Sequence, residues 1–288
     1  MDKFTYFEEA LRQGDAEGMV DQGGGPMPYF TDPRTGEQRI LNFFPTPHNH
    51  PMMLASPARK VANIPESMFR DFTAETIIPI ADQNGRGACV CFATVCAMLK
   101  LMAMMGLPVP PLSQWFLYSM VNGGVDAGSS IGDGMQAAVT VGVPEDKYAT
   151  YGQIRPKGIS QAAMSAPKWQ FEGVESLGSG NADEIIQYVA ERGVLVLDVR
   201  AGNWFDTDSN GTVAFGRGMT NHAVAVGGGL RKFNGEWQPL VTNSWATTWG
   251  QKGRGWLTQN HLKNTQDVWK PSGMKLRGDF PLPPVAPV

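Results

Sequence analysis

Three cysteines stand close together in the chain, and the first of them follows a loop that contains two glycines. Gly85 and Gly87 lie on either side of Arg86, and Cys89 then begins a long apolar stretch that predicts a helix. A cysteine on the first turn of a helix lies near unpaired backbone N–H groups and the positive end of the helix dipole, and both favour the thiolate. The side-chain amide of Gln83, on the same loop, can reach the same place. This stretch therefore predicts a nucleophilic thiol with a hydrogen-bond donor beside it.

An imidazole and an amide occur much later in the chain, each at one end of a predicted strand. His222 opens a short apolar run, and Asn243 closes the apolar run that begins at Leu240. Taken alone, such a histidine is more often a core residue and such an asparagine an ordinary turn residue. Together with Cys89 they supply a base and a group that orients it. Trp245 would shield the hydrogen bond between the imidazole and the amide from water.

This combination resembles the papain-like cysteine peptidases, and the loop before Cys89 looks more like bacterial and viral members. In that family a Gln six residues before the Cys completes the oxyanion hole, the His opens a strand, and the Asn belongs to an Asn-Ser-Trp motif followed by Trp-Gly. His222 follows Cys89 by 133 residues, inside the range of about 130–150 found in papain relatives. The matching motifs lie between about Ile64 and Leu257, and they are Gln83 with Cys89, Asn221-His222-Ala223-Val224, Asn243-Ser244-Trp245 and Trp249-Gly250.

The resemblance implies an α+β, papain-like fold, in which a helical half and a β-barrel-like half lie on either side of the active-site cleft. It implies a cysteine endopeptidase that hydrolyses polypeptides through an acyl-enzyme intermediate, with no cofactor and no metal. Cys89 would be the nucleophile, His222 the base and then the acid, Asn243 the group that orients the ring, and Gln83 an oxyanion donor. The segment expected to line the substrate cleft is Gly128, Ser129, Ser130 and Ile131.

The charge state expected for Cys89 and His222 is a thiolate–imidazolium pair. The helix N-terminus and the imidazolium would lower the pKa of the thiol, to about 3–4 by analogy with such pairs. The same pairing would raise the pKa of the imidazole, because its charged form gains a partner. Cys91 and Cys96 fit better as small buried residues of the helix.

Two other functions remain open. An acyl-transfer enzyme, such as a transglutaminase-like or peptide-ligating relative, would use the same triad with a different acceptor. A catalytically silent homologue would only bind peptides, although the intact catalytic set argues against it. Arg86 stands where many secreted members have a disulfide-bonded cysteine, and no helical prodomain motif of the usual kind precedes Ile64.

The composition excludes several classes of protein. In 288 residues, 42% are apolar and 18% charged, which indicates a globular chain. The net charge of −3 argues against nucleic acid or anionic membranes as partners. The apolar stretch Ala88–Met105 is nearly as long as a membrane span, but it contains Lys100 and lacks a flanking basic cluster, so a buried helix is favoured. Clustered cysteines and no visible secretory signal predict a protein that is cytoplasmic or exported without a cleaved Sec signal.

The elements that must position these residues fall into four zones. Residues 1–63 form an N-terminal extension, 64–170 the helical half with Cys89, 171–276 the β-rich half with His222 and Asn243, and 277–288 a proline-rich tail. Predicted helices are Phe4–Leu11, one from near Ala88 to Gly106, Ser113–Val121, Ile131–Val141 and Asp183–Arg192. Predicted strands are Val194–Leu197, His222–Val226 ending at the three following glycines, Leu240–Asn243 and Gly255–Thr258.

The N-terminal extension has many prolines and little periodicity, so we expect an irregular arm or partial disorder. Phe30, Phe43 and Phe44 could anchor it to the rest of the protein. It either covers the active site as a removable inhibitor, as in a zymogen, or wraps the surface as a permanent extension. His48 and His50 fit a solvated loop better than a metal site.

Overall fold

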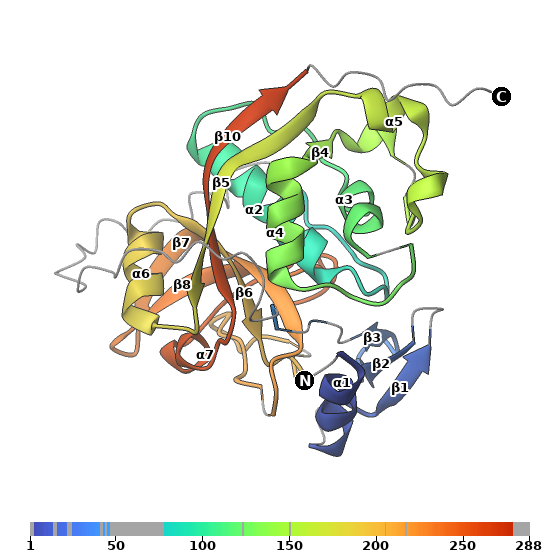
Figure 1. The fold of residues 1–288 in the computed structure, drawn as a ribbon. Coiled ribbons are helices and arrows are strands. Elements are labelled where there is room, and N and C mark those ends of the chain that lie inside the picture. Colours follow the sequence, from blue (N-terminus) through green and yellow to red (C-terminus); the bar gives the residue numbers. More distant parts are fainter. Residues whose placement is uncertain are drawn as a thin grey trace.

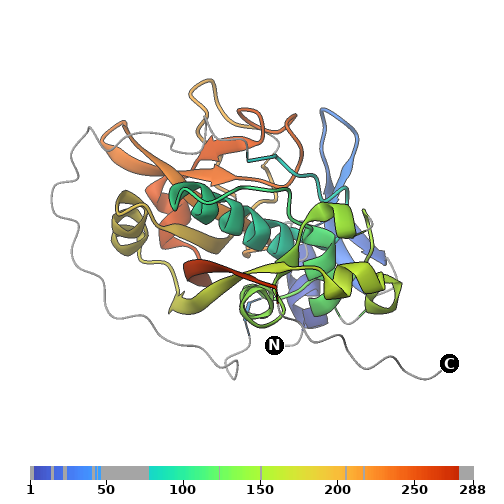
Figure 2. The ribbon, with the colours of Figure 1, turned by 90° about the horizontal axis from the view of Figure 1, so that it is seen from above.

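The computed structural model describes residues 3–13, 16–21, 25–40, 43, 45–46, 78–122, 124–149, 151–204, 206–216 and 218–278. Helices between Gln114 and Ser165 gather on one side of the long strand pair formed by β5 (Lys168–Gly178) and β10 (Val268–Arg277), and the later helices lie on the other side with the strands from Val194 to Trp256 (Figure 1). Figure 2 shows α2, in teal, crossing the middle of the molecule between orange strands and green helices. The α+β arrangement predicted from the sequence, with a helical half and a β-rich half, is confirmed.

Three helices build the helical half: α2 (Cys89–Met104), α3 (Gln114–Val121) and α4 (Ile131–Thr140). Helix α2 is apolar on nearly all sides, as expected for a helix that other elements cover. It ends before Gly106, whose backbone φ of 70° is one that glycine adopts readily. Side-chain oxygens of Ser113 and Ser130 accept backbone N–H groups at the starts of α3 and α4. Short turns follow at Asp146–Tyr148 (η2), Pro156–Gly158 (η3) and Gln161–Ser165 (α5).

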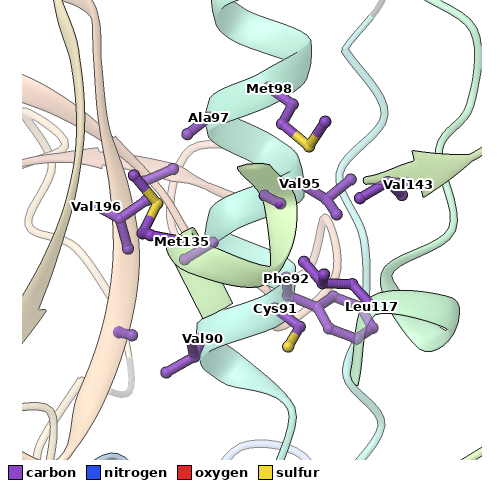
Figure 3. Packing of buried hydrophobic residues seen from close by; sticks show 14 of the residues in the cluster. Val90, Cys91, Phe92, Val95, Ala97, Met98, Leu117, Met135, Val143 and Val196 are labelled. Atoms are coloured by element: carbon purple, nitrogen blue, oxygen red, sulfur yellow. The ribbon is translucent and has the colours of Figure 1, made fainter. Parts of the chain in front are cut away.

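The core of this half surrounds α2. Figure 3 shows Phe92 and Val95 pointing toward Leu117 and Val143, with Met135 and Val196 on another side of the helix. Helix α2 therefore packs against both helices and strands, which fixes the direction in which its first residue, Cys89, points.

The β-rich half is a seven-stranded antiparallel sheet in the order β4-β5-β10-β6-β7-β8-β9. Two helices, α6 (Ala182–Ala190) and α7 (Gln259–Lys263), lie beside it. A second apolar cluster, with Trp204, Trp245 and Trp249, fills this half. The strands are β4 (Val143–Pro144), β5 (Lys168–Gly178), β6 (Val194–Val199), β7 (His222–Phe233), β8 (Glu236–Thr242), β9 (Arg254–Trp256) and β10 (Val268–Arg277).

The N-terminal elements form a small unit of their own, which we call the arm unit. It contains α1 (Lys3–Arg12) and a three-stranded antiparallel sheet of β1 (Gly18–Asp21), β2 (Pro26–Thr31) and β3 (Gln38–Ile40). Its apolar centre consists of Tyr6, Phe7, Met27 and Ile40. The helix predicted at Phe4–Leu11 is confirmed as α1. The expectation of an irregular arm after it is wrong for β1, β2 and β3, since cross-strand pairing and a small apolar centre order them.

Most predicted elements agree with the structure to within a few residues, with one clear exception. Strand β7 does not stop at its three glycines but continues to Phe233 through a register shift between Val226 and Leu230. Glycine is needed here because a side chain on Gly227 would meet the backbone of Gly193. The β5 and β10 strands were not predicted individually. His48, His50, Phe44 and the last ten residues of the tail lie outside the described residues.

Candidate active site

Cys89 is the first residue of α2, at the end of the loop that begins at Asp82. The backbone N–H groups of Ala223, Val90 and Cys89 itself favour its thiolate, as a helix start should. Its side chain is completely buried, however, and this burial raises the pKa of the Cys89 thiol to about 12. In this closed state the thiol is therefore protonated.

The side chain of Gln83 lies across the loop toward the β-rich half. Its Nε2 donates to the carbonyl oxygen of Arg86 at 2.7 Å, and its Oε1 accepts from Ser244 Oγ at 2.6 Å. The backbone N–H of Gln83 donates to the carbonyl of Ser244 at 3.0 Å. Because a primary amide has two N–H groups, one remains for an oxyanion.

His222 and Asn243 meet because they lie at the ends of neighbouring strands. His222 is the first residue of β7, Asn243 directly follows the last residue of β8, and these strands are paired antiparallel. His222 Nε2 lies 2.8 Å from Asn243 Oδ1. A side-chain carbonyl oxygen only accepts, so the hydrogen-bond pattern assigns the proton to Nε2 and leaves Nδ1 as the basic nitrogen.

Aromatic rings enclose this imidazole. Trp245 stacks on it with ring centroids 4.7 Å apart and planes at 28°, and Trp204 meets it edge-on at 6.4 Å. Trp249 in turn stacks on Trp204 and donates its indole N–H to the Trp204 carbonyl at 2.8 Å. Rings on these sides exclude water from the His222–Asn243 hydrogen bond.

The expected thiolate–imidazolium pair is not what this closed structure favours. Burial lowers the pKa of His222 to about 4, although the hydrogen bond to Asn243 acts to raise it, and the positive charge of Arg39 lowers it further. Together with the raised pKa of Cys89, this makes both groups neutral near pH 7. The sequence-based expectation considered the two partners but not the complete removal of water from both.

The segment expected to line the substrate cleft lies at the start of α4. Ser129 forms a parallel bridge with Phe43, Ser130 caps the helix, and Ile131 is buried as its first residue. Gly128 donates its backbone N–H to the hydroxyl of Tyr118 at 3.3 Å. Its φ of 71° is readily accessible to glycine.

Two residues that follow the arm unit, Phe43 and Thr46, lie between the two halves. Phe43 donates its backbone N–H to the carbonyl of Asn221 at 3.3 Å, on the β-rich side, while it pairs with Ser129 on the helical side. Thr46 also contacts both halves. Its hydroxyl oxygen accepts the N–H of Gly132 on the helical side at 3.0 Å, and its own N–H donates to Asp267 Oδ2 on the β-rich side at 3.0 Å.

Arg39 extends this cover to the imidazole. Its side chain is only 3% exposed, and its guanidinium lies 5.6 Å from the centroid of the Trp245 ring. It also pairs with Glu37 at 2.8 Å. On the same side, Tyr6 of α1 donates its hydroxyl to the carbonyl of Thr220, two residues before His222. The arm unit therefore packs against the segment that carries the imidazole.

Two residues at the site were missed by sequence reasoning. Arg39 lies in a short strand with no catalytic motif around it, so nothing in the sequence marked it. Asp126 is completely buried and bonds to the Arg86–Gly87 stretch. The replacement of a family cysteine by Arg86 was a signal that a partner for this side chain should exist. Among the described residues, no group of three potential ligand side chains could hold a metal ion, and no helix is long and apolar enough to cross a membrane.

Comparison with known proteins gives one family and several relatives. Residues 64–268 match the model of the family described as papain family cysteine protease. Zingipain-2 of Zingiber officinale is 27% identical over 202 residues, covering 68% of this chain and 86% of its own. Cathepsin K of Gallus gallus is 28% identical over 204 residues, covering 66% of this chain and 57% of its own. A structure of digestive procathepsin L 3 of Tenebrio molitor has a TM-score of 0.59 at 18% identity, covering 79% of this chain and 75% of its own.

Proposed function

The chain belongs to the papain family of cysteine proteases, and on this premise we propose that it is an endopeptidase that cleaves polypeptides. The observation that carries the proposal is the 2.8 Å contact between His222 Nε2 and Asn243 Oδ1, which leaves Nδ1 free to act as a base. Cys89 at the start of α2 supplies a nucleophile. The Arg86-Gly87 loop supports a further proposal, that the chain is nearer to bacterial and viral members, although the relatives reported above are eukaryotic.

The reaction proceeds in two steps. The Nδ1 of His222 takes the proton of Cys89, and Sγ attacks the substrate carbonyl carbon to give an oxyanion. The free N–H of Gln83 and the backbone N–H of Cys89 stabilise that oxyanion, where one donor is worth about 3–4 kcal/mol. His222 then protonates the leaving amine. Water, deprotonated by the same imidazole, releases the acyl group and restores the thiol.

The test is covalent labelling by a peptidyl epoxide at mildly acidic pH, followed by mass-spectrometric mapping of all three cysteines. We expect the label on Cys89 alone, with a parallel loss of hydrolysis of a short fluorogenic peptide. A control with the protein unfolded in denaturant should label no cysteine selectively. Absence of selective labelling in the folded protein would leave only the peptide-binding alternative, whereas labelling of Cys89 without peptide hydrolysis would favour the acyl-transfer alternative.

We further propose that Phe43 and Thr46 act as an inhibitor held in the substrate cleft. Phe43 and Thr46 each contact both halves of the protein, which is the position that a bound substrate chain must occupy. Arg39 lies over the Trp245 ring beside the imidazole, and Phe43 belongs to the buried cluster that contains Cys89. Burial raises the pKa of Cys89 and lowers that of His222, so both are uncharged near pH 7. The likeness to a procathepsin supports this resting state.

Substitutions in the full chain test the inhibition. Arg39→Ala and Phe43→Ala should each raise the rate of hydrolysis of a small peptide at least fivefold, because they loosen the cover over Cys89. Arg12→Ala is the matched control, since it removes the exposed Arg12–Glu9 ion pair within α1 of the same arm unit. A chain that begins at Asn63 should be faster still, and added arm peptide should slow it. If the substituted chains are no faster, or the short chain is insoluble, the arm is structural.

A further inference from the structure

A buried carboxylate joins the loop before Cys89 to the segment that lines the cleft. Asp126 is completely buried, and its Oδ1 accepts the backbone N–H of Gly87 at 2.8 Å and the hydroxyl of Tyr118 at 2.5 Å. Its Oδ2 lies 3.4 Å from the guanidinium of Arg86. Through these contacts a single buried carboxyl group has partners on two separate elements, the loop and helix α3. None of its partners belongs to the Cys–His–Asn set.

The loop residues that contact Asp126 also set the orientation of both expected oxyanion donors, the Gln83 amide and the Cys89 backbone N–H. The carbonyl of Arg86 accepts Nε2 of Gln83, so the orientation of that amide depends on where Arg86 lies. Gly87 is two residues before Cys89, so its position sets the direction of the chain as it enters α2. A shift of this short stretch would therefore move the Gln83 amide and the Cys89 backbone N–H together.

The same network reaches the segment expected to line the substrate cleft. The Tyr118 hydroxyl that donates to Asp126 also accepts the N–H of Gly128, the neighbour of Ser129. Ser129 is the residue whose backbone pairs with Phe43 in the covered site. The network Gly87–Asp126–Tyr118–Gly128 thus fixes the oxyanion donors relative to the backbone against which an extended chain lies.

We infer that Asp126 and Tyr118 are positioning residues for the oxyanion hole, an inference that rests on the proposed peptidase function. The Arg86–Asp126 contact occupies the place where many secreted relatives have a disulfide-bonded cysteine, and it needs no oxidising compartment. Hydrogen bonds to a buried charged group are strong and directional, so they can hold a loop that belongs to neither a helix nor a sheet. Because the oxyanion exists only after attack, the network acts on kcat rather than on substrate binding.

The experiment compares Asp126→Asn and Tyr118→Phe with the unchanged full-length protein. Asn at 126 keeps an oxygen for Gly87 but loses the negative charge that faces Arg86, and Phe at 118 keeps the ring but loses the hydroxyl. We expect kcat on a short fluorogenic peptide to fall about 10- to 100-fold in each, a part of the 10²–10³-fold effect of removing an oxyanion donor. KM should stay within threefold, and Arg86→Lys, which keeps the positive charge, should retain most of the activity.

Glu175→Gln is the matched control, because it removes one side of the Glu175–Lys270 ion pair, 2.9 Å long, between β5 and β10. Its kcat should stay within twofold of the unchanged protein. Equal losses of kcat in the control and in the Asp126 variant, or an unchanged kcat in folded Asp126→Asn and Tyr118→Phe, would overturn the inference. Should Asp126→Asn not fold, Tyr118→Phe decides the question, since it keeps the buried ring.

Hydrogen exchange separates failure of this inference from failure of the proposed function. We expect exchange at least tenfold faster in peptides covering Gln83–Cys91 of both variants, with unchanged exchange in β7. This measurement does not require activity. If the unchanged protein hydrolyses no peptide, the proposed function fails and exchange alone decides: faster exchange confined to the loop supports the positioning role, and unchanged exchange overturns it.

Discussion

Cys89 lies at the end of a loop, whereas His222 and Asn243 lie at the ends of paired strands. The sheet register brings the imidazole and the amide together, and aromatic rings around Trp245 keep water away. The loop has only an isolated bridge between Asp82 and Trp245, so hydrogen bonds to Asp126 and from Ser244 hold the rest of it. The comparison indicates that strand ends need mainly packing around them, while a loop that must aim its donors needs buried polar partners. Substitutions on the two sides should therefore have different signatures.

The largest effect is expected on the loop side, from Cys89→Ala. Removal of Sγ removes the nucleophile, and Cys91, two residues further along α2, points to another face of the helix and should not replace it. Turnover of an unstructured protein substrate should fall to background. Circular dichroism and the unfolding midpoint should change little, since the side chain is small. Unchanged turnover by this variant would show that Cys89 is not the nucleophile.

On the strand side, His222→Ala should be about as damaging as Cys89→Ala, because the members of a catalytic unit are not additive. Asn243→Ala should be milder, since Asn243 only orients the ring and holds its tautomer. Steady-state rates on one fluorogenic peptide compare the three variants directly. A greater loss of activity in Asn243→Ala than in His222→Ala would reverse the roles assigned to these residues.

The difference between the strand side and the loop side should be clearest in the stability of a variant at Trp245. This side chain is 1% exposed and stacks on the imidazole, so Trp245→Ala should lower the free energy of unfolding by about 3–5 kcal/mol, as for other buried aromatic truncations. Tyr118→Phe keeps its ring and should cost much less. Urea unfolding of both variants measures the difference. Equal destabilisation would mean that the two sides are held in the same way.

The dependence of stability on pH should follow from three buried groups. Burial lowers the pKa of both His222 and His261 to about 4. Their imidazoles are therefore protonated at a higher pH in the unfolded chain than in the folded one, and stability is lost as pH falls from about 6.5 to 4. Burial raises the pKa of Asp198 to about 7, with the charge of Asp267 adding to it, so this group acts in the opposite sense and loses stability as pH rises from about 4 to 7.

With two imidazoles against one carboxyl group, unfolding free energy should rise between pH 4.5 and 6.5. Asp198→Asn removes the opposing group and keeps an oxygen for the N–H groups of Gln266 and Asp267, so the rise should become steeper. Denaturant unfolding at several pH values measures both slopes. A shallower slope in Asp198→Asn would contradict the assignment of the raised pKa to this carboxyl group.

The sequence was most informative where one short segment carries both an element and a chemical group. Helix α2 with Cys89, and the strands that carry His222 and Asn243, could be predicted from local apolar patterns and motif spacing. Contacts between distant segments could not. The β5–β10 pair joins segments about a hundred residues apart, β7 continues through glycines that ordinarily signal a stop, and the arm sheet forms among prolines.

Sequence reasoning also did not predict the charge state of Cys89 and His222, again because this state depends on contacts between distant segments. The motifs identified Cys89 and His222 as the reactive groups and Phe43 as an anchor of the extension. Nothing in the sequence marked Arg39, whose charge adds to the effect of burial on the imidazole. Burial raises the pKa of the thiol and lowers that of the imidazole, so it determines which of their forms are stable. A motif can identify reactive groups, but it does not specify how much water reaches them.

The most direct test of the catalytic account is to trap the covalent intermediate. A chromogenic peptide ester is mixed with full-length protein and with the Arg39→Ala variant, the reaction is quenched in acid within the first turnover, and each cysteine is mapped by mass spectrometry. We predict an acyl group on Cys89 alone, more abundant in Arg39→Ala, and absent from chains that carry His222→Ala. Ester hydrolysis without any adduct on Cys89, or adducts spread equally over Cys91 and Cys96, would contradict the proposed mechanism.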